Sequence, residues 1–561
     1  MSALQPLAQR LRRALLLSLL VPALAAAAPA PLPPHAAIAS GHPLATQAGL
    51  AALAQGGNAF DAAVAVSAVL AVVEPASSGV GGGGFYLLHV AADGHDVMLD
   101  ARETAPAAAT RDMYVHDGKA GGSTEGPLAA GIPGEPAAWA WLAARYGKLP
   151  LATNLQAAIK VAREGFPLYP RLQNAIRVKQ QRLAASKDAA AVFLVKGAVP
   201  EVGALIRQPL LAATLQMLAR QGPDGFYKGP FASRLAAAVK QDGGIWTAED
   251  LAGYHVVERA PIRMHYRDAT LVMAAPPSAG GLVIGDALAI LDGYDLPALD
   301  PLTRRHLTIE ALRRAYRDRA EYLGDPDFVP IPTEQLLSPL YAAGQRTSIR
   351  LDRATASDVL RPVFTGEESP STTHFSVLDR QGNRVGATIS INLFFGATYM
   401  VPGTGFLLND TMDDFAVAAG RPNAFGLVGA DANAVAPGKR ALSSMTPTFV
   451  ERPGSLMIIG SPGGSTIISN VLGGILNWFD GKSAAEIVAA PRVHHQYLPD
   501  VVMLEPGALQ PEERADLERR GHKLREGRGN WGNTQVVTWD YASGKVEAAS
   551  DPRGAGAGLV Y

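Results

Sequence analysis

The fold prediction for this chain depends on one short stretch, Ser371-Thr372-Thr373-His374-Phe375-Ser376. It places a cluster of hydroxyl groups after a polar segment and before a β-like run. If the backbone is cut before Thr372, that residue gains a free α-amino group beside its own hydroxyl. An α-amine has a pKa of about 7.7–8, so it can act as general base for the adjacent oxygen at neutral pH. The same residues also suit the ordinary start of a threonine-rich strand, and alone they leave both interpretations open.

Composition limits the function classes. The chain has 561 residues, of which 48% are hydrophobic and 18% charged. This balance supports a large buried core, organised as several domains or one large α/β unit, and excludes disorder over most of the chain. Fifty basic and 51 acidic residues give a net charge of −1, which argues against nucleic-acid binding. With no cysteine, the chain has no thiol nucleophile, disulfide or thiolate metal site, and we predict no cofactor and no metal.

The first 27 residues have the three parts of a secretory signal peptide. Basic residues up to Arg13 precede an apolar run over residues 14–24, and small Ala-x-Ala patterns follow. The apolar run is shorter than the roughly 20 residues that a membrane span needs. We therefore expect an exported protein, periplasmic or alternatively secreted, with no membrane span after removal of the signal.

On the N-terminal side of the hydroxyl cluster, the patterns are mainly helical. Residues 50–73 are rich in Ala and Val, with a break at Gly56-Gly57 and Asn58 as a candidate N-cap. The glycines at 79–84 match G-x-G-x-x-G, but they follow a helix and precede a strand at 85–90. A dinucleotide site needs the opposite order, so these glycines predict a tight turn into a buried strand.

On the C-terminal side of the hydroxyl cluster, the residue pattern becomes typical of β-strands. Short runs at residues 374–378, 385–391 and 456–459 alternate with Gly, Pro and Asn turns. Just before the cluster, residues 350–371 are polar and rich in Ser, Thr and Glu. We expect them to form an exposed joint between the two parts.

Motifs spread along the chain resemble those of the gamma-glutamyltransferase (gamma-glutamyltranspeptidase) family, over about residues 40–561. Any single motif is weak evidence, but their number and order are specific. They are Gly56-Gly57-Asn58-Ala59-Phe60-Asp61-Ala62-Ala63, Arg102-Glu103-Thr104-Ala105-Pro106, Ala162-Arg163-Glu164-Gly165-Phe166, Thr372-Thr373-His374, Met412-Asp413-Asp414-Phe415, Leu442-Ser443-Ser444-Met445, Gly460-Ser461-Pro462-Gly463-Gly464-Ser465 and Asp551-Pro552-Arg553.

The resemblance implies an N-terminal nucleophile hydrolase fold, an α/β (α+β) αββα sandwich whose precursor cuts itself into two subunits. Cleavage between Ser371 and Thr372 implies a large subunit of residues 28–371 and a small subunit of residues 372–561, which stay together as a heterodimer. The implied activity is attack of Thr372 on the γ-glutamyl amide of glutathione and related compounds. The acyl-enzyme then passes to water, or to an amino acid or peptide acceptor.

The resemblance also implies a role for each site residue. Ser390 and Thr373 support the nucleophile, and the backbone N–H groups of Gly463 and Gly464 form the oxyanion hole. A γ-glutamyl group carries an α-carboxylate and an α-ammonium, so its pocket needs a cation and an anion. Residues that bind these two charges are, by resemblance, Arg102, Ser443 and Ser444 for the carboxylate and Asn392 and Asp414 for the ammonium.

Two positions depart from the family pattern. Thr411 stands where bacterial relatives often have a Gln that contacts the ammonium, and Phe425 stands in the lid loop (residues 420–433) where a Tyr is common.

Two other readings of the function remain open. One is a cephalosporin acylase of the same superfamily, which prefers glutaryl substrates. The other is an inactive exported relative. Asp414 and the lid-length segment favour the transferase, and the intact Thr372 argues against the inactive relative.

Overall fold

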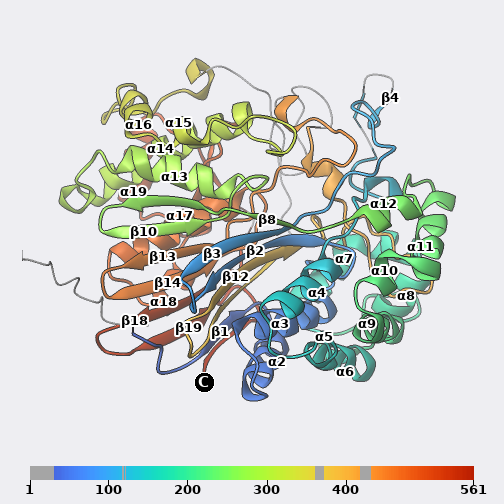
Figure 1. Ribbon diagram of the computed structural model, residues 1–561. Coiled ribbons are helices and arrows are strands. Elements are labelled where there is room, and N and C mark those ends of the chain that lie inside the picture. The colour runs from blue at the N-terminus through green and yellow to red at the C-terminus, as the bar shows by residue number, and fades with distance from the viewer. Residues whose placement is uncertain (1–30, 117–118, 121, 361–371, 417–430, 528) are drawn as a thin grey trace, which may run out of the picture. The chain divides into compact units, whose positions relative to one another are not determined.

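Two antiparallel β-sheets stacked face to face form the centre of the unit Pro33–Tyr561 (Figure 1). The computed structural model describes residues 31–561, except 117–118, 121, 361–371, 417–430 and 528. The predicted signal peptide, residues 1–27, therefore lies outside the described residues. Among the helices that the structure describes, none combines the length and apolar character required to cross a bilayer.

The first sheet holds the strand that follows Thr372 near its middle. Its order is β20 (Ala557–Val560), β1 (Ala37–Ser40), β11 (Thr373–Leu378), β12 (Arg384–Ser390), β2 (Gly83–Val90), β3 (His95–Ala101) and β8 (Val257–Arg259). The second sheet has the order β19 (Val546–Ser550), β18 (Gln535–Asp540), β14 (Ser455–Gly460), β13 (Thr448–Arg452), β10 (Ala269–Met273) and β9 (Ile262–Tyr266). The predicted strands around residues 374, 385 and 456 are thus confirmed.

Helices cover the outer face of each sheet. On the first sheet lie α2 (Pro43–Ala54), α3 (Ala59–Val73) and α4 (Glu135–Arg145), and on the second lie α13 (Gly280–Leu291), α17 (Thr466–Phe479) and α18 (Ala484–Ala489). The α14 helix (Pro301–Tyr322) packs on α13. This is the predicted αββα sandwich.

Further helices and small strands surround the sandwich. The helices are α5 (Leu151–Asn154), α6 (Gln156–Glu164), α7 (Pro170–Ala185), α8 (Lys187–Phe193), α9 (Pro209–Gln221), α10 (Asp224–Tyr227), α11 (Gly229–Gln241), α12 (Ala248–Gly253), α15 (Thr333–Leu336), α16 (Pro339–Arg346) and α19 (Pro511–Arg519). The small strands are β4 (Val115–His116), β5 (Lys119–Ala120), β6 (Phe166–Pro167), β7 (Leu205–Ile206), β15 (Val493–His494), β16 (Val502–Leu504) and β17 (Leu524–Glu526).

The helical pattern at residues 50–73 divides where the sequence predicts. The α2 helix ends before Gly56-Gly57, and Asn58 caps α3 by accepting from the Phe60 and Asp61 backbone N–H groups. The Asp61 side chain accepts from the Asn58 N–H in return, which completes a capping box. Every residue of α3 is buried, because it packs against β11 and β12.

Alternation along β11 fixes which groups face the second sheet. Phe375 and Val377 join the core that contains α3, whereas His374 and Ser376 point between the sheets. The His374 ring is hydrogen-bonded to Thr388 Oγ1 at 2.8 Å and Ser376 Oγ at 3.2 Å. Burial lowers the pKa of His374 to about 3, so this imidazole is neutral, and it lies against Gly460 of the second sheet.

The glycine run at 79–84 leads into β2, as predicted, and brings backbones into close contact. A Cβ on Gly82 would collide with the Ser390 carbonyl oxygen, and one on Gly81 would collide with that of Leu407. Glycine is required here because no side chain fits between these segments. The run therefore lets β12 end, at Ser390, directly against the turn before β2.

The described part of the predicted exposed joint, residues 350–360, is exposed or half-buried as expected, with Ser357 as the exception. Ser357 is fully buried, and its N–H donates to Asp500 Oδ2 at 2.9 Å. The Thr355 N–H donates to Glu310 Oε1 at 3.0 Å. The carboxylates of Glu310 on α14 and of Asp500 therefore hold the segment around Ser357 through its backbone. Ser371 and the rest of the joint lie outside the described residues.

These charges form what we call the α14 ion network: Glu310, Arg313, Arg314 and Asp500. Glu310 pairs with Arg314 at 2.7 Å and with Arg313 at 3.3 Å, and Arg313 also contacts Asp500. Burial opposes ionisation of Glu310, but the two guanidiniums prevail and lower its pKa. The network is a set of mutually compensated charges.

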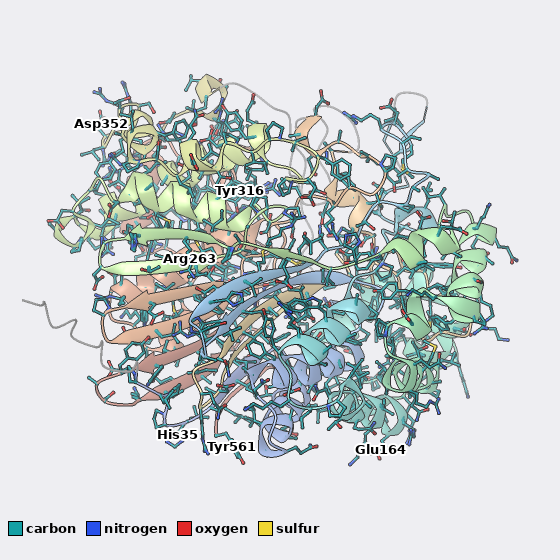
Figure 2. The ribbon with its side chains drawn as sticks, viewed as in Figure 1. His35, Glu164, Arg263, Tyr316, Asp352 and Tyr561 are labelled. Carbon is teal, nitrogen blue, oxygen red and sulfur yellow. The ribbon has the colours of Figure 1, made fainter. Side chains whose placement is uncertain are left out.

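The end of the chain pairs with its first described strand. β20 runs antiparallel beside β1, and the backbones of Ala36 and Tyr561 exchange two hydrogen bonds of 3.0 and 2.7 Å. Figure 2 shows Tyr561 beside His35. Residue 36 and the C-terminal residue are therefore direct neighbours in space.

Candidate active site

Thr372 lies at the end of a ladder that places it against Ser390. β11 pairs with β12 so that Thr373 faces Ile389, and the same register carries residue 372 to residue 390. The Thr372 Oγ1 and Ser390 Oγ atoms are 3.2 Å apart. Ser390 Oγ also accepts from the Asn392 N–H at 2.8 Å. A hydroxyl pair therefore stands at the end of the first sheet.

A small cavity of about 20 Å³ opens beside this pair. Eight of the residues that the sequence predicts for the site line it, together with Arg319 and three apolar residues. The predicted ones are Arg102, Thr372, Ser390, Asn392, Asp414, Ser443, Ser444 and Gly464, and the apolar ones are Leu442, Met445 and Ile467. The structure thus brings residues from seven separate segments to one place.

Arg102 enters the cavity from the end of β3. Its side chain is 1% exposed, its Nε donates to the Ala441 carbonyl at 3.3 Å, and its Nη2 contacts Asp414 Oδ2. A cavity of this size holds little more than one water molecule, and the Arg102–Asp414 ion pair lines it. A larger ligand therefore requires lining side chains to move.

Asp414 is the last residue of a 3-10 turn, Thr411–Asp414. Burial raises its pKa to about 6, against the opposing effect of Arg102. Its backbone carbonyl accepts from Asn433 Nδ2 at 2.7 Å, while Asn433 Oδ1 accepts from the Leu442 N–H at 3.0 Å. Asn433 therefore couples the position of the carboxylate to the Ser443-Ser444 segment.

Glu103 is a buried carboxylate next to this pair. No role was predicted for it, although it belongs to the family motif that begins at Arg102. Its Oε2 lies 3.5 Å from Arg102 Nη1. Burial raises its pKa to about 7, while the charge of Arg102 and the hydroxyl of Thr411 oppose the rise. Arg102 is thus flanked by two carboxyl groups that hold protons more strongly than usual.

The predicted oxyanion turn joins β14 to α17. Gly463 and Gly464 have φ of 135° and 56°, and a Cβ on Gly463 would collide with Thr466 Oγ1. These are backbone conformations that glycine adopts without strain. The Tyr316 hydroxyl of α14 (labelled in Figure 2) donates to the Ser465 carbonyl and fixes the turn to the helix. Gly464 lines the cavity, whereas Gly463 lies behind it.

Asn392, Ser443 and Ser444 are each held by a hydrogen bond to the surrounding structure. Asn392 has φ of 76°, a region that Asn tolerates better than most residues, and its Nδ2 donates to the Asp410 carbonyl at 3.0 Å. The Ser443 N–H donates to the Pro277 carbonyl at 2.8 Å. Ser444 Oγ accepts from Arg319 Nη2 at 3.2 Å.

Two predicted residues lie next to the cavity without lining it. Thr411 faces Glu103, and its hydroxyl acts to lower the pKa of that carboxyl. Thr373 is buried on the other side of the ladder, where its hydroxyl acts to lower the pKa of the buried Glu74. Ser371 and Phe425 are outside the described residues, so the predicted cut and the lid residue remain predictions.

Arg319 is the cavity residue that sequence reasoning missed. It lies on α14 among several other arginines, so its charge alone did not distinguish it. A signal was available, because Arg319 shares helical spacing with the apolar residues Leu312 and Tyr316. A charged residue on the buried face of an amphipathic helix is expected to have a partner or a function.

His306, Glu310 and His522 form the one group of three potential metal ligands in the described ranges. Their other contacts do not suit a cation. His306 Nδ1 and His522 Nε2 are hydrogen-bonded at 2.8 Å, and Glu310 already pairs with Arg313 and Arg314. Two fixed positive charges would repel a metal cation. We therefore interpret Glu310 as a member of the α14 ion network and the two histidines as its neighbours.

Comparisons with known proteins agree on the relatives of this chain. The family model described as gamma-glutamyltranspeptidase matches residues 45–561. A glutathione hydrolase proenzyme from Pseudomonas sp. (strain A14) is 42% identical over 489 residues, which are 86% of this chain and 85% of the relative. The glutathione hydrolase proenzyme of Escherichia coli (strain K12) is 41% identical over 527 residues, 92% and 90% of the two chains.

Among solved structures, the crystal structure of a cephalosporin acylase from Bacillus halodurans superposes with a TM-score of 0.82. Its sequence is 30% identical, and the match covers 94% of this chain and 95% of the acylase. The likeness extends over both sheets and both helical layers, so the arrangement of the whole sandwich is shared.

Proposed function

The chain belongs to the gamma-glutamyltranspeptidase family, and from this premise we propose that Thr372 is the nucleophile with which it acts on γ-glutamyl compounds. The protein is an N-terminal nucleophile hydrolase and an enzyme, a gamma-glutamyltransferase and glutathione hydrolase. One observation carries the assignment of the nucleophile: Thr372 shares a single cavity with a cation, an anion and a glycine turn.

The first step of the proposed mechanism is maturation. The Thr372 hydroxyl attacks the preceding carbonyl, the acyl group moves from nitrogen to oxygen, and water hydrolyses the resulting ester. The products are a large subunit that ends at residue 371 and a small subunit that begins at Thr372 with a free amine. The relatives are named proenzymes, which agrees with a precursor of this kind.

The second step is acyl transfer. The Thr372 amine takes the hydroxyl proton, and Oγ attacks the γ-carbonyl of the donor. The amine then gives that proton to the leaving amino group, so the amide breaks and an ester remains. Backbone N–H groups at Gly463 and Gly464 would stabilise the tetrahedral oxyanion. Water or the amine of an amino acid or peptide then attacks the ester and regenerates Thr372.

Donor recognition follows from the Arg102–Asp414 contact. The donor's α-carboxylate replaces Asp414 beside Arg102, and its α-ammonium takes the place of Arg102 beside Asp414. The exchange leaves neither buried charge without a partner, which is why a zwitterion suits the site better than a single charge. Asn392, Ser443 and Ser444 add hydrogen bonds. Because Thr411 faces Glu103, the ammonium contact that a Gln often supplies at this position falls to Asp414 and Asn392.

A glutaryl acylase is the second candidate, favoured by the structural likeness to cephalosporin acylase. Glutaryl groups carry the carboxylate but lack the ammonium. Such a donor would leave Asp414 buried against the ligand without a counter-charge, and for this reason we prefer the γ-glutamyl donor.

The associations and the location of the protein also stay proposals. We propose that the two pieces remain together as a heterodimer, because β1 and β2 of the N-terminal part flank β11 and β12 in one sheet. The substrates are small molecules, namely γ-glutamyl donors and amino acid or dipeptide acceptors. The signal-like pattern at residues 1–27 supports export, with the periplasm as the proposed destination.

The decisive experiment tests Thr372 in the full precursor. Thr372→Ala removes the hydroxyl needed for both steps, so it should give one band on a denaturing gel and release no aniline from a γ-glutamyl anilide. Thr372→Ser is the matched control, because it keeps the hydroxyl and should still be cut and active. N-terminal sequencing of the small subunit should begin at residue 372. Any other start, or activity in Thr372→Ala, would reject the assignment.

A further inference from the structure

Arg319 reaches the cavity from α14, the long helix that packs on α13. It is 5% exposed and lines the same space as Thr372 and Asp414. Its charge also acts on Asp414, whose pKa it helps to lower against the dominant effect of burial. The guanidiniums of Arg102 and Arg319 therefore line one cavity.

The contact between Arg319 and Ser444 fixes the direction of the serine hydroxyl. Ser444 Oγ accepts from Arg319 Nη2 at 3.2 Å. A hydroxyl has one proton to donate and two lone pairs. A guanidinium offers only donors, so the serine proton cannot point at Arg319 and remains for another acceptor. Since Ser444 lines the cavity, the ligand is the acceptor that this arrangement suits.

The charges that line the cavity favour a carboxylate. Arg102, Arg319 and the ionised Asp414 leave a net charge of +1, and Arg102 is already in contact with Asp414. When a zwitterionic donor enters, Asp414 takes the ammonium. Both guanidiniums and the Ser444 hydroxyl then face the carboxylate, which can accept four or more hydrogen bonds.

We propose that Arg319 is a positioning residue that selects donors with an α-carboxylate, acting through Ser444 and through its charge. The proposal rests on the proposed function, because it concerns the donor pocket of the same reaction. Arg319 and Ser444 come from opposite sides of the predicted cut, so the carboxylate is bound jointly by the two subunits.

The test compares two donors on Arg319→Met, which keeps an unbranched side chain and removes its charge. The donors are a γ-glutamyl anilide and a 4-aminobutyryl anilide, which differ only in the α-carboxylate. We expect the KM for the γ-glutamyl anilide to rise about 10- to 100-fold, the size of one charge-assisted hydrogen bond, with kcat much less affected. The kcat/KM for the 4-aminobutyryl anilide should stay unchanged.

A double-mutant cycle tests the route through Ser444. If Arg319 acts through that hydroxyl, then combining Arg319→Met with Ser444→Ala should cost much less than the sum of the two single effects. Arg319→Lys keeps the charge without the fork and should give an intermediate selectivity. Arg304→Met is the matched control, since Arg304 lies on the same helix and pairs with Asp480 away from the cavity; its kinetics should equal the wild type.

Three results would overturn the inference. One is an equal loss of kcat/KM on both anilides, another is full additivity with Ser444→Ala, and the third is unchanged donor selectivity in Arg319→Lys and Arg319→Met. If Arg319→Met is not cut or melts early, Arg319→Lys and Ser444→Ala carry the selectivity test. A wild-type protein that is cut yet inert on the γ-glutamyl anilide would instead reject the proposed function itself.

Discussion

The molecule contains two groups of buried arginines and carboxylates that differ in how far their charges are compensated. In the α14 ion network, each carboxylate has several charged or N–H partners, and the pKa values of Glu310 and Asp500 are lowered. Around Arg102, burial prevails instead, and the pKa of Asp414 and Glu103 is raised to about 6 and about 7. Perturbed acids beside a cavity are typical of functional sites. The charges of the first group are compensated within the protein and stabilise the fold. The charges of the second group are left for a ligand to compensate.

The largest effect should come from breaking the α14 ion network. Glu310→Gln removes the counter-charge of two buried guanidiniums, which typically costs about 3–5 kcal/mol. The thermal midpoint should fall markedly, while the KM of the folded fraction for a γ-glutamyl anilide stays unchanged. Asp268→Asn is the control, because Asp268 pairs with Arg452 at the surface and such pairs contribute at most about 1 kcal/mol. Equal midpoints in the two variants would contradict a structural role.

A smaller effect, on selectivity rather than stability, should follow from Asp414→Asn. It removes the anion that compensates the donor's ammonium, a charge-assisted bond of about 1.5–3 kcal/mol. The preference for γ-glutamyl over glutaryl anilide should therefore shift by at least tenfold, with glutaryl hydrolysis unaffected or improved. Measuring kcat/KM for both donors checks this. A parallel loss on both, together with an early melting curve, would make Asp414 a structural acid like Glu310.

The smallest effect should appear in the pH dependence of stability. Glu103 keeps its proton in the folded state up to about pH 7, whereas the unfolded chain releases it near pH 4.5. The folded state thus binds more protons in this window, and its stability falls as pH rises. Glu103→Gln removes this fall, so its stability relative to wild type should increase by about 2 kcal/mol between pH 5 and 7.

Denaturant unfolding at several pH values provides that measurement. The α14 ion network should show the opposite sign. The pKa of Glu310 is lowered, so its contribution is present above its unfolded pKa and is lost as pH falls. A relative stability of Glu103→Gln that does not change with pH would mean that this carboxyl titrates normally in the folded protein.

Local patterns predicted the elements that carry the site. The alternation after Thr372 predicted β11, Asn58 predicted the start of α3, and the order of helix, glycines and strand excluded a nucleotide site. The resemblance to the family then led to Arg102, Asp414 and the oxyanion glycines, and the structure places Arg102, Asp414 and Gly464 around one cavity.

What could not be predicted depends on partners that are distant in sequence. Arg313 and Asp500 are 187 residues apart, so nothing local marks Ser357 as buried between them. Arg319 looks like its neighbours on α14 until the fold places Ser444, 125 residues later, against it. The raised pKa of Glu103 likewise follows from burial, which its motif does not encode.

The pairing of Tyr561 with Ala36 has a consequence for the order of the chain. If the last residue were linked to residue 36 by a short connection, the proposed cleavage site before Thr372 could become the only beginning of a single polypeptide. Such a circular permutant would start at Thr372, run through the present C-terminus and continue into β1, with every strand of the first sheet in its present place. Its free amine would come from initiator-methionine removal rather than from a cut. The precursor and the permutant would then be two linear orders of the same closed chain. The first is opened between residues 561 and 36, and the second before Thr372.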